Sequence, residues 1–597
     1  QARQAGALSR HQSQTIAEHD GMSAAGMTKE GCVEKIWLKS YMPGVPAEID
    51  IDEFKSLGDL FEKSTKTFAA RPAYINMGKS LSYSELDRRS RDFAAYCQSV
   101  LKLPRGARIA VMMPNLLQYP VCMFGALRAG YVVVNCNPLY TPRELEHQLK
   151  DSGAEAIVIV ENFAHVLQEV IAHTPVKHVI VTGLGDMLGF PKSLLINFAV
   201  RHIKKMVPAW QLPGAVRFNA ALARGAAAPL QAVAVGHDDI AFLQYTGGTT
   251  GVSKGAMLTH RNIIANLQQA HAWLKPVLSA DGKEVIITAL PLYHIFALTA
   301  NCLTFLKIGA ANVLITNPRD IPGFVKELAQ HRFTCLTGVN TLFNALLHDP
   351  GFARLDFSTL RVTLGGGMAV QKAVAEKWKQ VTGHPLVEAY GLTETSPAAT
   401  INPLDIAEYN GSIGLPVSST EVAIRSDDGH YLPTGEAGEI CVRGPQVMKG
   451  YWNRPEETAK VLLPDGFLMT GDVGIMDAKG FVRIVDRKKD MILVSGFNVY
   501  PNEVEDIVAM HPGVLEVAAI GVPDEKSSEA VMIFVVKKDP NLTAEALLAH
   551  CRENLTGYKM PRHIEFRNDL PKTNVGKILR RALRDEYLAK APGAAAR

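Results

Sequence analysis

The chain has 597 residues, of which 47% are hydrophobic and 20% charged, and its formal net charge is +4 from 63 basic and 59 acidic side chains. This length exceeds what one hydrophobic core usually organises and predicts several domains. The near balance of charge argues against a dedicated nucleic-acid-binding protein. The eight cysteines include no C-x-x-C pair, which disfavours a metal–thiolate site or a disulfide framework and favours a reducing compartment.

Three features of the sequence bear on membrane attachment. Residues 1–26 are polar and lack the apolar region of a secretory signal, so we expect a disordered extension. No segment reaches the roughly 18 uninterrupted apolar residues of a membrane span. Residues 192–208 combine apolar side chains with Arg201, Lys204 and Lys205, which is compatible with a membrane-surface helix, although we favour a surface helix packed on its own domain. We expect a cytoplasmic protein and leave open its association with the inner face of the membrane.

Up to about residue 368, short β-branched segments alternate with amphipathic ones. The segments ARIAVMM (107–113), EAIVIV (155–160) and KHVIVTG (177–183) are typical of buried strands. Residues 142–153 begin with proline and end with glycine, as helices often do. Strands that alternate with helices predict βαβ units and mostly parallel sheets.

The pattern changes after about residue 410. Residues 421–485 contain short strands separated by the turn sequences DDG, TGE and AKG, which predict a small antiparallel element. We predict an α/β fold in which a large N-terminal domain of stacked βαβ sheets, with this antiparallel element, spans residues 27–486. A small mobile α+β C-terminal domain would follow at 487–597, with its hinge in the charged cluster DRKKD at 486–490.

A segment rich in glycine and threonine, YTGGTTGVSKG (245–255), follows the apolar strand DIAFLQY and precedes a helix that Thr259 can cap. Glycines let backbone N–H groups approach an anion, while hydroxyls and the lysine add donors and charge. The segment lacks the G-K-[ST] ending of a Walker loop, and alone it predicts a phosphate-binding loop or a surface turn equally well. The candidate phosphate-binding residues are Thr246, Gly247, Gly248, Thr249, Thr250, Gly251 and Lys254.

Seven segments follow one another in the order YTGGTTGVSKGAMLTH, PLYHIFAL, GGGMAV, YGLTET, TGDVG, DRKKDMILVSGFNVYP and PKTNVGKILRR. They resemble the core motifs of the acyl-adenylate-forming superfamily, which includes acyl-CoA synthetases, luciferases and nonribosomal adenylation domains, over residues 30–585. The sequences of three segments are most similar to those of bacterial long-chain fatty-acid–CoA ligases. The segments are PLYHIFALT, ITNPRDIPGFVKEL and TGVNTLFNALL. The resemblance implies ATP-dependent conversion of a long-chain fatty acid through acyl-AMP to acyl-CoA, with release of AMP and pyrophosphate.

The residue types in these motifs suit a nucleotide and its metal. Tyr390 offers a flat ring to a purine, Thr393 a hydroxyl to a phosphate, and Glu394 a hard oxygen ligand to Mg²⁺. The carboxylate of Asp472 is a suitable acceptor for ribose hydroxyls. The resemblance implies these same roles. The resemblance also places Gly366, Gly367, Gly391 and Arg487 in the nucleotide site. It places Thr246 in the magnesium site.

Three further positions take their roles from the resemblance. Lys577 matches the C-terminal lysine that neutralises the carboxylate and the α-phosphate as they react. Lys489 matches the hinge, about which the C-terminal domain would rotate to present Ser495 and Gly496 to coenzyme A. His294 alone would be read as a hydrogen-bonded core residue, but it matches a histidine that positions the acyl substrate. The residues expected in catalysis are Lys577, Glu394, Thr246 and His294.

The acyl pocket is outlined by the apolar segments on either side of this histidine and in TGVNTLFNALL. An ordinary hydrophobic core is the alternative interpretation. Some long-chain relatives have a gating tryptophan where this chain has Leu298, so its selection of chain length can differ. At about 0.8 kcal/mol per buried methylene, a long chain binds well but its length is coarsely discriminated. The predicted pocket residues are Tyr293, His294, Phe296, Leu298, Val339 and Thr341.

Two other functions are weighed against the CoA ligase. An acyl-AMP ligase would load a carrier protein, but no carrier domain follows Lys577 and no insertion is evident near the hinge. A non-catalytic fatty-acid or acyl-nucleotide binding protein would be free to lose Thr246, Glu394, Asp472 and Lys577, which this chain retains. The expected partners are the fatty acid, ATP, Mg²⁺ and CoA, and a homodimer is left open.

Overall fold

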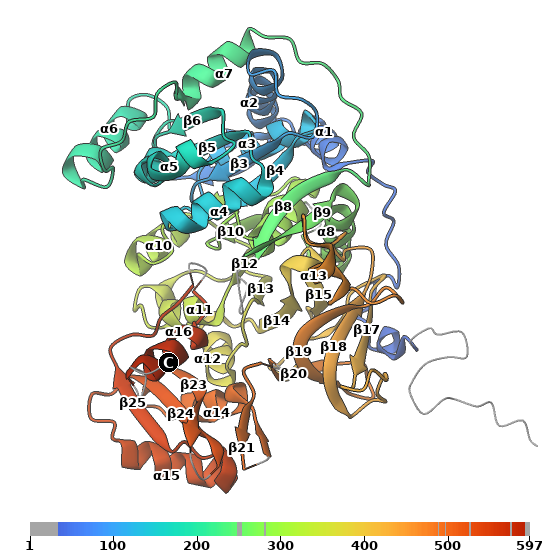
Figure 1. Ribbon diagram of the computed structural model, residues 1–597, viewed down its shortest axis with the longest axis vertical. Coiled ribbons are helices and arrows are strands. Elements are labelled where there is room, and N and C mark those ends of the chain that lie inside the picture. Colours follow the sequence, from blue (N-terminus) through green and yellow to red (C-terminus); the bar gives the residue numbers. More distant parts are fainter. Residues whose placement is uncertain are drawn as a thin grey trace, which may run out of the picture.

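The computed structural model describes residues 34–246, 253–279, 282–487, 489–495, 497–524, 527–573 and 576–590. The polar extension predicted at residues 1–26 lies outside them. In the described residues the strands form four sheets, which Figure 1 shows stacked along the long axis of the molecule. The N-terminal sheets lie toward one end, and the strands after residue 490 lie at the other.

The first sheet has seven strands in the order β7–β6–β5–β3–β4–β8–β9. Its neighbours pair in parallel, apart from the antiparallel hairpin of β8 and β9. The three strands predicted here are confirmed as β3, β5 and β6. The seven strands are β3 (Arg108–Met112), β4 (Val132–Cys136), β5 (Ala156–Val160), β6 (His178–Thr182), β7 (Val216–Arg217), β8 (Ile240–Thr246) and β9 (Lys254–Thr259).

The second sheet has nine strands in the order β16–β15–β14–β13–β12–β10–β11–β1–β2. It is parallel from β14 to β1, with antiparallel strands at both ends. The expectation of mostly parallel sheets is therefore confirmed. The strands are β1 (Pro72–Asn76), β2 (Lys79–Ser82), β10 (Val285–Thr288), β11 (Ala311–Leu314), β12 (Cys335–Gly338), β13 (Val362–Gly365), β14 (Leu386–Gly391), β15 (Ala398–Ile401) and β16 (Leu415–Pro416).

Helices cover these two sheets, and their ends follow local capping signals. At the start of α4 (Pro142–Ser152), the Thr141 hydroxyl accepts the N–H of Glu144, whose carboxylate accepts the N–H of Thr141 over 2.8 Å. Gly153 ends this helix with φ +64, so the predicted helix is confirmed. The other helices here are α1 (Leu57–Thr67), α2 (Tyr83–Ala95), α3 (Gln118–Arg128), α5 (Ala164–Val170), α6 (Lys192–Phe198), α7 (Phe218–Ala226), α8 (His260–Leu274), α9 (Thr304–Lys307), α10 (Ile321–Leu328), α11 (Asn340–Leu347) and α12 (Lys372–Thr382).

The third sheet is the small antiparallel element that the turn sequences predict, and its order is β17–β18–β19–β20. It carries one short helix, α13 (Pro455–Ala459). Strand β20 ends at Arg487, and the next strand begins at Ile492 in another sheet, so the chain passes between sheets in the segment predicted as the hinge. The strands are β17 (Glu421–Arg425), β18 (Ala437–Arg443), β19 (Leu468–Met476) and β20 (Val482–Arg487).

The last sheet belongs to the C-terminal α+β segment. Strands β22–β21–β24–β23 are antiparallel neighbours, and β25 pairs in parallel with β24. Its buried side chains form cores separate from those of the N-terminal sheets. No described helix is long and apolar enough to cross a membrane. The elements are β21 (Ile492–Val494), β22 (Phe497–Val499), α14 (Pro501–Ala509), β23 (Val514–Asp524), β24 (Ser528–Lys537), α15 (Ala544–Asn554), β25 (His563–Arg567) and α16 (Arg580–Lys590).

Candidate active site

A cavity of about 2110 Å³ lies where the ends of β8, β13 and β14 face the C-terminal domain. Its walls include residues from both N-terminal sheets, the small antiparallel sheet and the segment 572–584. Pockets for small ligands usually measure about 300–1,000 Å³, so this one has room for more than one substrate. Ligand sites at the carboxyl ends of parallel strands are the general rule in α/β proteins.

Most of the residues predicted from the motifs meet in this cavity, although they come from segments far apart in the sequence. Gly247, Gly248, Thr249, Thr250, Gly251 and Gly496, and the side chain of Arg487, lie outside the described residues. The predicted residues that line the cavity are Thr246, Lys254, Tyr293, His294, Phe296, Val339, Thr341, Gly366, Gly367, Tyr390, Gly391, Thr393, Glu394, Asp472, Lys489 and Lys577.

Leu298 and Ser495 are placed elsewhere. Leu298 lies in the π-helical segment Ala297–Leu303, fully buried in the main hydrophobic core, and does not line the cavity. The chain becomes helical after Phe296, so successive side chains point in different directions and Leu298 turns away. Ser495 lies in the exposed turn between β21 and β22, where its N–H donates to the oxygen of Ser527 over 2.7 Å. In this conformation Ser495 is therefore outside the cavity.

The nucleoside end of the cavity is built by Tyr390 and Asp472. The Tyr390 hydroxyl donates to Asp472 Oδ2 over 2.7 Å, which joins β14 to β19. Asp472 pairs across the small sheet with Arg487, so the two predicted ribose contacts are neighbours on adjacent strands. Beside Tyr390, Gly391 admits no side chain, because a Cβ there would lie 1.8 Å from the oxygen of Pro397. These contacts bring an aromatic face and a buried carboxylate to one wall.

The phosphate end is built by the β8–β9 hairpin, which pairs Thr246 with Lys254. Lys254 Nζ donates to Glu457 Oε2 over 2.6 Å and lies 4.9 Å from the centre of the Tyr451 ring. The Tyr451 hydroxyl in turn donates to Glu394 Oε1 over 2.7 Å. Burial and the charge of Glu394 raise the pKa of Tyr451, so its hydroxyl keeps its proton. A connected set of charged and hydroxyl groups thus lines this end of the cavity.

Tyr451 and Glu457 were not predicted from the sequence. Both lie in the segment GYWNRPEET (450–458), which joins β18 to β19 and carries α13. The hydrogen bond from Lys254 is the main cause that lowers the pKa of Glu457, to about 2. The aromatic and acidic residues of this segment were the available signal, but they lie about 200 residues from the glycine-rich loop, so the sequence alone did not connect the two.

The loop that carries Lys577 is docked on the N-terminal domain. The Thr341 hydroxyl donates to the oxygen of Gly576 over 2.9 Å, and the N–H of Lys577 donates to Thr573 Oγ1 over 3.0 Å. His294 faces the same part of the cavity. Its pKa is lowered to about 4, first by burial and then by the positive charge of Lys577, so the imidazole is neutral near pH 7. This suits a positioning role for His294, a neutral side chain beside the cation of Lys577.

Arg580 holds the predicted hinge segment against the C-terminal domain. Its guanidinium contacts Glu505 Oε2 at 2.6 Å, Asp486 Oδ1 at 3.4 Å and Asp490 Oδ2 at 3.8 Å. Asp486 is fully buried, and its other oxygen accepts the N–H of Asn502 over 2.9 Å. Arg580 remains charged because its carboxylate partners raise its pKa despite burial. The motif DRKKD is therefore anchored at both of its aspartates.

Two carboxyl groups from different domains, Glu388 of β14 and Asp506 of α14, lie near enough for the charge of Asp506 to raise the pKa of Glu388. Glu388 is 7% exposed and accepts the N–H of Val370 over 3.2 Å. Burial, with a smaller contribution from the charge of Asp506, raises its pKa to about 8. Burial and the neighbouring Glu505 raise the pKa of Asp506 to about 7. Near neutral pH the two groups therefore hold at least one proton between them, a feature that the sequence did not indicate.

The cavity also has apolar walls beyond the predicted acyl pocket. They belong to β10, β12, β13 and the helices that pack on them, in the second hydrophobic core. The additional apolar residues are Trp273, Ile286, Phe305, Cys335, Val362 and Leu364.

This combination of stacked parallel sheets, a small C-terminal domain and a cavity between them defines a nucleotide-dependent ligase architecture. The profile of the family described as AMP-binding enzyme matches residues 61–452, and that of the AMP-binding enzyme C-terminal domain matches residues 503–577. The chain belongs to the AMP-binding enzyme family.

Relatives within the family are similar over nearly the whole chain. The long-chain-fatty-acid–CoA ligase of Yersinia pestis is 61% identical over 554 residues, covering 93% of this chain and 98% of the relative. That of Escherichia coli O157:H7 is 59% identical over 558 residues, covering 94% and 99%. The ligase of the same name from Bacillus subtilis is 39% identical over 557 residues, covering 93% and 98%.

Solved structures share the same fold. The anthranilate CoA ligase AuaEII, in complex with anthranoyl-AMP, aligns with a TM-score of 0.80 at 25% identity, covering 91% of this chain and all of that one. ATP-bound MatB from Rhodopseudomonas palustris aligns with a TM-score of 0.76 at 29% identity, covering 89% and 99%. The fold prediction is therefore confirmed at the level of whole domains.

Proposed function

We propose that this protein is a long-chain-fatty-acid–CoA ligase that forms acyl-AMP from ATP and releases pyrophosphate, then transfers the acyl group to CoA. The observation that carries the proposal is the meeting of Lys577, Glu394 and the Tyr390–Asp472 pair in one cavity. The names of relatives at 55–61% identity, over nearly their full lengths, support the substrate class.

In the first half-reaction the fatty-acid carboxylate attacks the α-phosphorus of ATP, and the bond to the β-phosphate oxygen breaks. The substrate carboxylate is ionised near pH 7, so the protein needs no general base. Tyr390 and Asp472 would hold the adenosine, and Thr246 and Lys254 the departing phosphates. Lys577 would neutralise the negative charges of the carboxylate and the α-phosphate as the two groups approach each other. Neutral His294 would orient the carboxylate without competing for its charge.

The residues present fit a magnesium ion. Glu394 and Thr246 supply hard oxygen atoms at the phosphate end. The described residues form no metal site of three or more His, Cys, Asp or Glu side chains, so substrate phosphates would have to supply the other ligands. Mg²⁺ in nucleotide sites is usually bound by one or two carboxylates together with substrate phosphates, and it would offset charge on the leaving pyrophosphate. Replacing Glu394 with Gln should raise the Mg²⁺ concentration for half-maximal activity, whereas replacing the exposed Glu376 should not.

In the second half-reaction the thiol of CoA attacks the acyl carbonyl of acyl-AMP, and AMP leaves. Ser495 is exposed outside the cavity in the present conformation. A rotation of the C-terminal domain about Lys489 would withdraw Lys577 and bring Ser495 and Gly496 to the acyl group. Replacing Lys489 with Pro should trap one conformation, and unchanged rates for both half-reactions would remove the hinge assignment.

The acyl chain would run from His294 past Tyr293, Phe296 and Val339. Thr341 lies at the same wall, where it also contacts the loop of Lys577. A panel of saturated acids from hexanoate to octadecanoate, with products identified by mass, would define the preferred chain length. Because each methylene contributes about 0.8 kcal/mol when buried, we expect affinity to rise with length until the channel is filled.

The reaction class is tested by incubating the protein with ATP, Mg²⁺, palmitate and CoA. AMP, pyrophosphate and palmitoyl-CoA are the expected products. Release of ADP and phosphate would exclude adenylation, and formation of palmitoyl-AMP that CoA does not consume would favour a ligase that loads a carrier protein. No turnover, with palmitate still bound, would favour the non-catalytic alternative. We further propose a cytoplasmic location in contact with a membrane.

A further inference from the structure

The segment 190–206 exposes a group of large apolar side chains. It comprises the loop before α6, the helix itself, the π-helical turn Ala199–Ile203 and the residues after it. No residue of the helix or the turn is buried, and six large apolar side chains in the segment are between 54% and 86% exposed. We call these six residues the α6 patch. They are Phe190, Leu194, Leu195, Phe198, Ile203 and Met206.

The helix packs on its own domain, as expected, and Ile196 contacts the main hydrophobic core, but the side chains of the α6 patch stay exposed. Leu194 and Phe198 are four residues apart and therefore share a face of the helix. Asn197 and Arg201, also four residues apart, make hydrogen bonds with the domain. The helix is held by these polar side chains together with Ile196, while Leu194, Leu195 and Phe198 are exposed.

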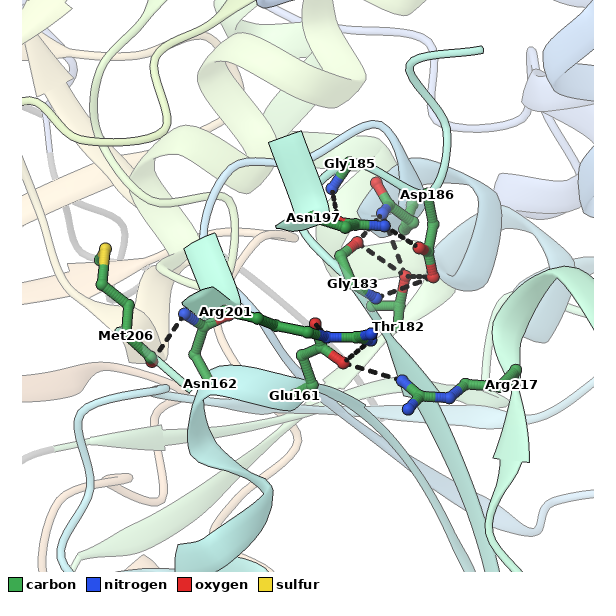
Figure 2. Close-up of polar contacts among 11 residues, drawn as sticks. Glu161, Asn162, Thr182, Gly183, Gly185, Asp186, Asn197, Arg201, Met206 and Arg217 are labelled. Carbon is green, nitrogen blue, oxygen red and sulfur yellow. Dashed lines mark hydrogen bonds and ion pairs between the residues drawn. The ribbon is translucent and has the colours of Figure 1, made fainter. Parts of the chain in front are cut away.

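Figure 2 shows the ion pairs that fix the second half of the segment. Glu161 is 1% exposed and receives two hydrogen bonds from Arg201, of which the bond from Nε is 2.8 Å long. Arg217 of β7 donates to the same carboxylate over 2.8 Å. Asn162 donates to the oxygen of Met206 over 3.0 Å. A buried carboxylate with two cations is costly to break, so the turn is firmly attached.

The first half of the segment is fixed by Asn197 (Figure 2). Its side-chain oxygen accepts the N–H of Gly185 over 2.7 Å, and its amide donates to Asp186 Oδ1 over 2.8 Å. The other oxygen of Asp186 accepts the N–H of Gly183 over 2.7 Å and the hydroxyl of Thr182 over 3.1 Å. These bonds fix the orientation of α6 relative to the segment that follows β6. The α6 patch is therefore presented by a defined structure.

The segment that carries the α6 patch has side-chain charges of one sign. Residues 187–237 contain no Asp or Glu, but they contain six Lys or Arg residues. Lys204 and Lys205 are exposed next to the apolar side chains. The two carboxylates beneath the segment, Glu161 and Asp186, are turned inward and bonded. A partner with an apolar interior and an anionic surface would match this combination.

We propose that the α6 patch docks this protein onto the surface of an anionic phospholipid bilayer. Leucine and phenylalanine side chains enter the boundary between headgroups and acyl chains, while nearby lysines remain among the lipid phosphates. A complementary protein surface would need acidic and apolar groups at matching positions, whereas an anionic bilayer supplies both everywhere. The match of charge and apolarity thus selects the lipid surface.

The position of the α6 patch suits an enzyme that works while bound. In Figure 1, α6 and the C-terminal sheet lie toward opposite ends of the long axis. Docking through α6 would leave the C-terminal domain in water, where ATP and CoA are dissolved. This consequence rests on the proposed function, because a long-chain acid dissolves in the bilayer and its nucleotide partners do not.

The test is flotation of the purified protein with vesicles of phosphatidylcholine and phosphatidylglycerol. The wild type should float, and it should float much less with phosphatidylcholine alone or at high salt. The double variant Leu194→Ser/Phe198→Ser should bind more weakly by roughly tenfold for each side chain removed. The double variant Lys204→Gln/Lys205→Gln should lose roughly fivefold for each lysine, and only on anionic vesicles.

Matched controls carry the same changes at exposed sites elsewhere. Leu588→Ser/Met510→Ser removes two exposed apolar side chains, and Lys66→Gln/Lys102→Gln removes two exposed lysines. Lys102 has φ +57, close to the +51 of Lys205, so that pair is also matched in backbone strain. Both controls should bind vesicles as the wild type does. Circular dichroism and turnover of detergent-dispersed palmitate should be unchanged in all four variants.

Three outcomes would overturn the proposal. The α6 variants could float like the wild type, or the wild type could fail to bind anionic vesicles. The third is that the wild type self-associates in sedimentation and the α6 variants are monomeric without any vesicle binding, which would make the patch an interface between two copies. Absence of turnover in every protein, with normal vesicle binding, would instead reject the proposed ligase function and keep the docking surface.

Discussion

The hydroxyl of Thr341 and the backbone oxygen of Gly576 are 2.9 Å apart, and this hydrogen bond joins α11 to the loop that presents Lys577. Gly576 has φ +85, and a Cβ there would also lie 2.9 Å from Thr341 Oγ1. The contact therefore requires a glycine at this position. It connects the wall of the acyl pocket with the residue expected to act on the acyl carboxylate.

Replacing Thr341 with Val should weaken this docking without a large change of shape. We expect acyl-AMP formation to slow by about three- to tenfold, because one hydrogen bond is worth roughly 0.5–1.5 kcal/mol. Thioester formation from supplied acyl-AMP should be unchanged. Rapid-quench measurement of the two half-reactions checks this. An equal loss in both would mean that Thr341 acts only through the acyl pocket.

Replacing Lys577 with Ala should lower the rate of acyl-AMP formation by about 10²- to 10⁴-fold, because a cation aimed at developing charge is a large contribution. Transfer of the acyl group from supplied palmitoyl-AMP to CoA should be largely retained. Lys590→Ala is the matched control, since that lysine pairs with Glu586 on the exposed side of α16. If K577A slowed both halves equally, the division of roles between the two conformations would be wrong.

Replacements of Tyr390 and Asp472 should weaken the binding of ATP and not that of palmitate. Asp472→Asn should raise the KM for ATP by about tenfold or more, and Tyr390→Phe by a smaller factor, because a charged acceptor is worth more than a neutral one. The KM for palmitate should change little. Tyr431→Phe is a matched control, since Tyr431 donates to Asp465 in an equivalent pair away from the cavity. Steady-state kinetics that showed the same change in that control would indicate a loss of folding.

Replacing Arg580 with Met should destabilise the hinge region. The buried carboxylate of Asp486 would lose its cation, and breaking such a buried pair costs about 3–5 kcal/mol. Urea unfolding should therefore show a separate early transition of the C-terminal domain. Arg581→Met is the control, because Arg581 pairs with Asp585 in solvent and such pairs contribute about 0–1 kcal/mol. A single unchanged transition in R580M would show that this cluster does not hold the hinge.

Glu388 predicts a specific dependence of stability on pH. Its pKa is raised from 4.5 to about 8 in this conformation, so the folded state favours the protonated form. The unfolded state loses that proton at lower pH, and stability should therefore decrease as pH rises from about 4.5 to about 8. Glu388→Gln should reduce this decrease by about 1 kcal/mol or more in calorimetry. The exposed Glu376→Gln should leave the profile unchanged, and an E388Q profile parallel to the wild type would contradict the assignment.

Much of the fold follows from local signals. The helix 142–153 is specified by proline at its start and glycine at its end, and the strands 107–113, 155–160 and 177–183 by β-branched residues, so the structure shows them within a few residues of the prediction. The chemistry of Tyr390 and Asp472 is likewise implied by their side chains. Short-range sterics and the hydrogen-bonding capacity of a side chain do not depend on the rest of the chain.

Other features have no local signal because they depend on which segments meet. Nothing in YGLTET or GYWNRPEET alone indicates that Tyr451 bonds Glu394, or in LVEAYG that Glu388 faces Asp506. The same is true of Leu298, whose direction is decided by the turn into a helix. Pairings between distant residues, and the burial that shifts their pKa values, are properties of tertiary packing.

Strand and helix periodicity and the ordered motifs predicted the α/β class of fold and the kinds of side chain that a nucleotide and an acyl group would meet. The tertiary structure alone decided where those side chains come together, how the loop of Lys577 is docked, and that the apolar side chains of segment 190–206 face solvent. Amphipathic periodicity in a sequence shows that a helix has an apolar face, but it does not show which surface that face contacts. Here the carboxylates of Glu161, which is buried, and Asp186, which is partly buried, bond Arg201 and Asn197 on the inward side of the segment, and the side chains of the α6 patch are left exposed.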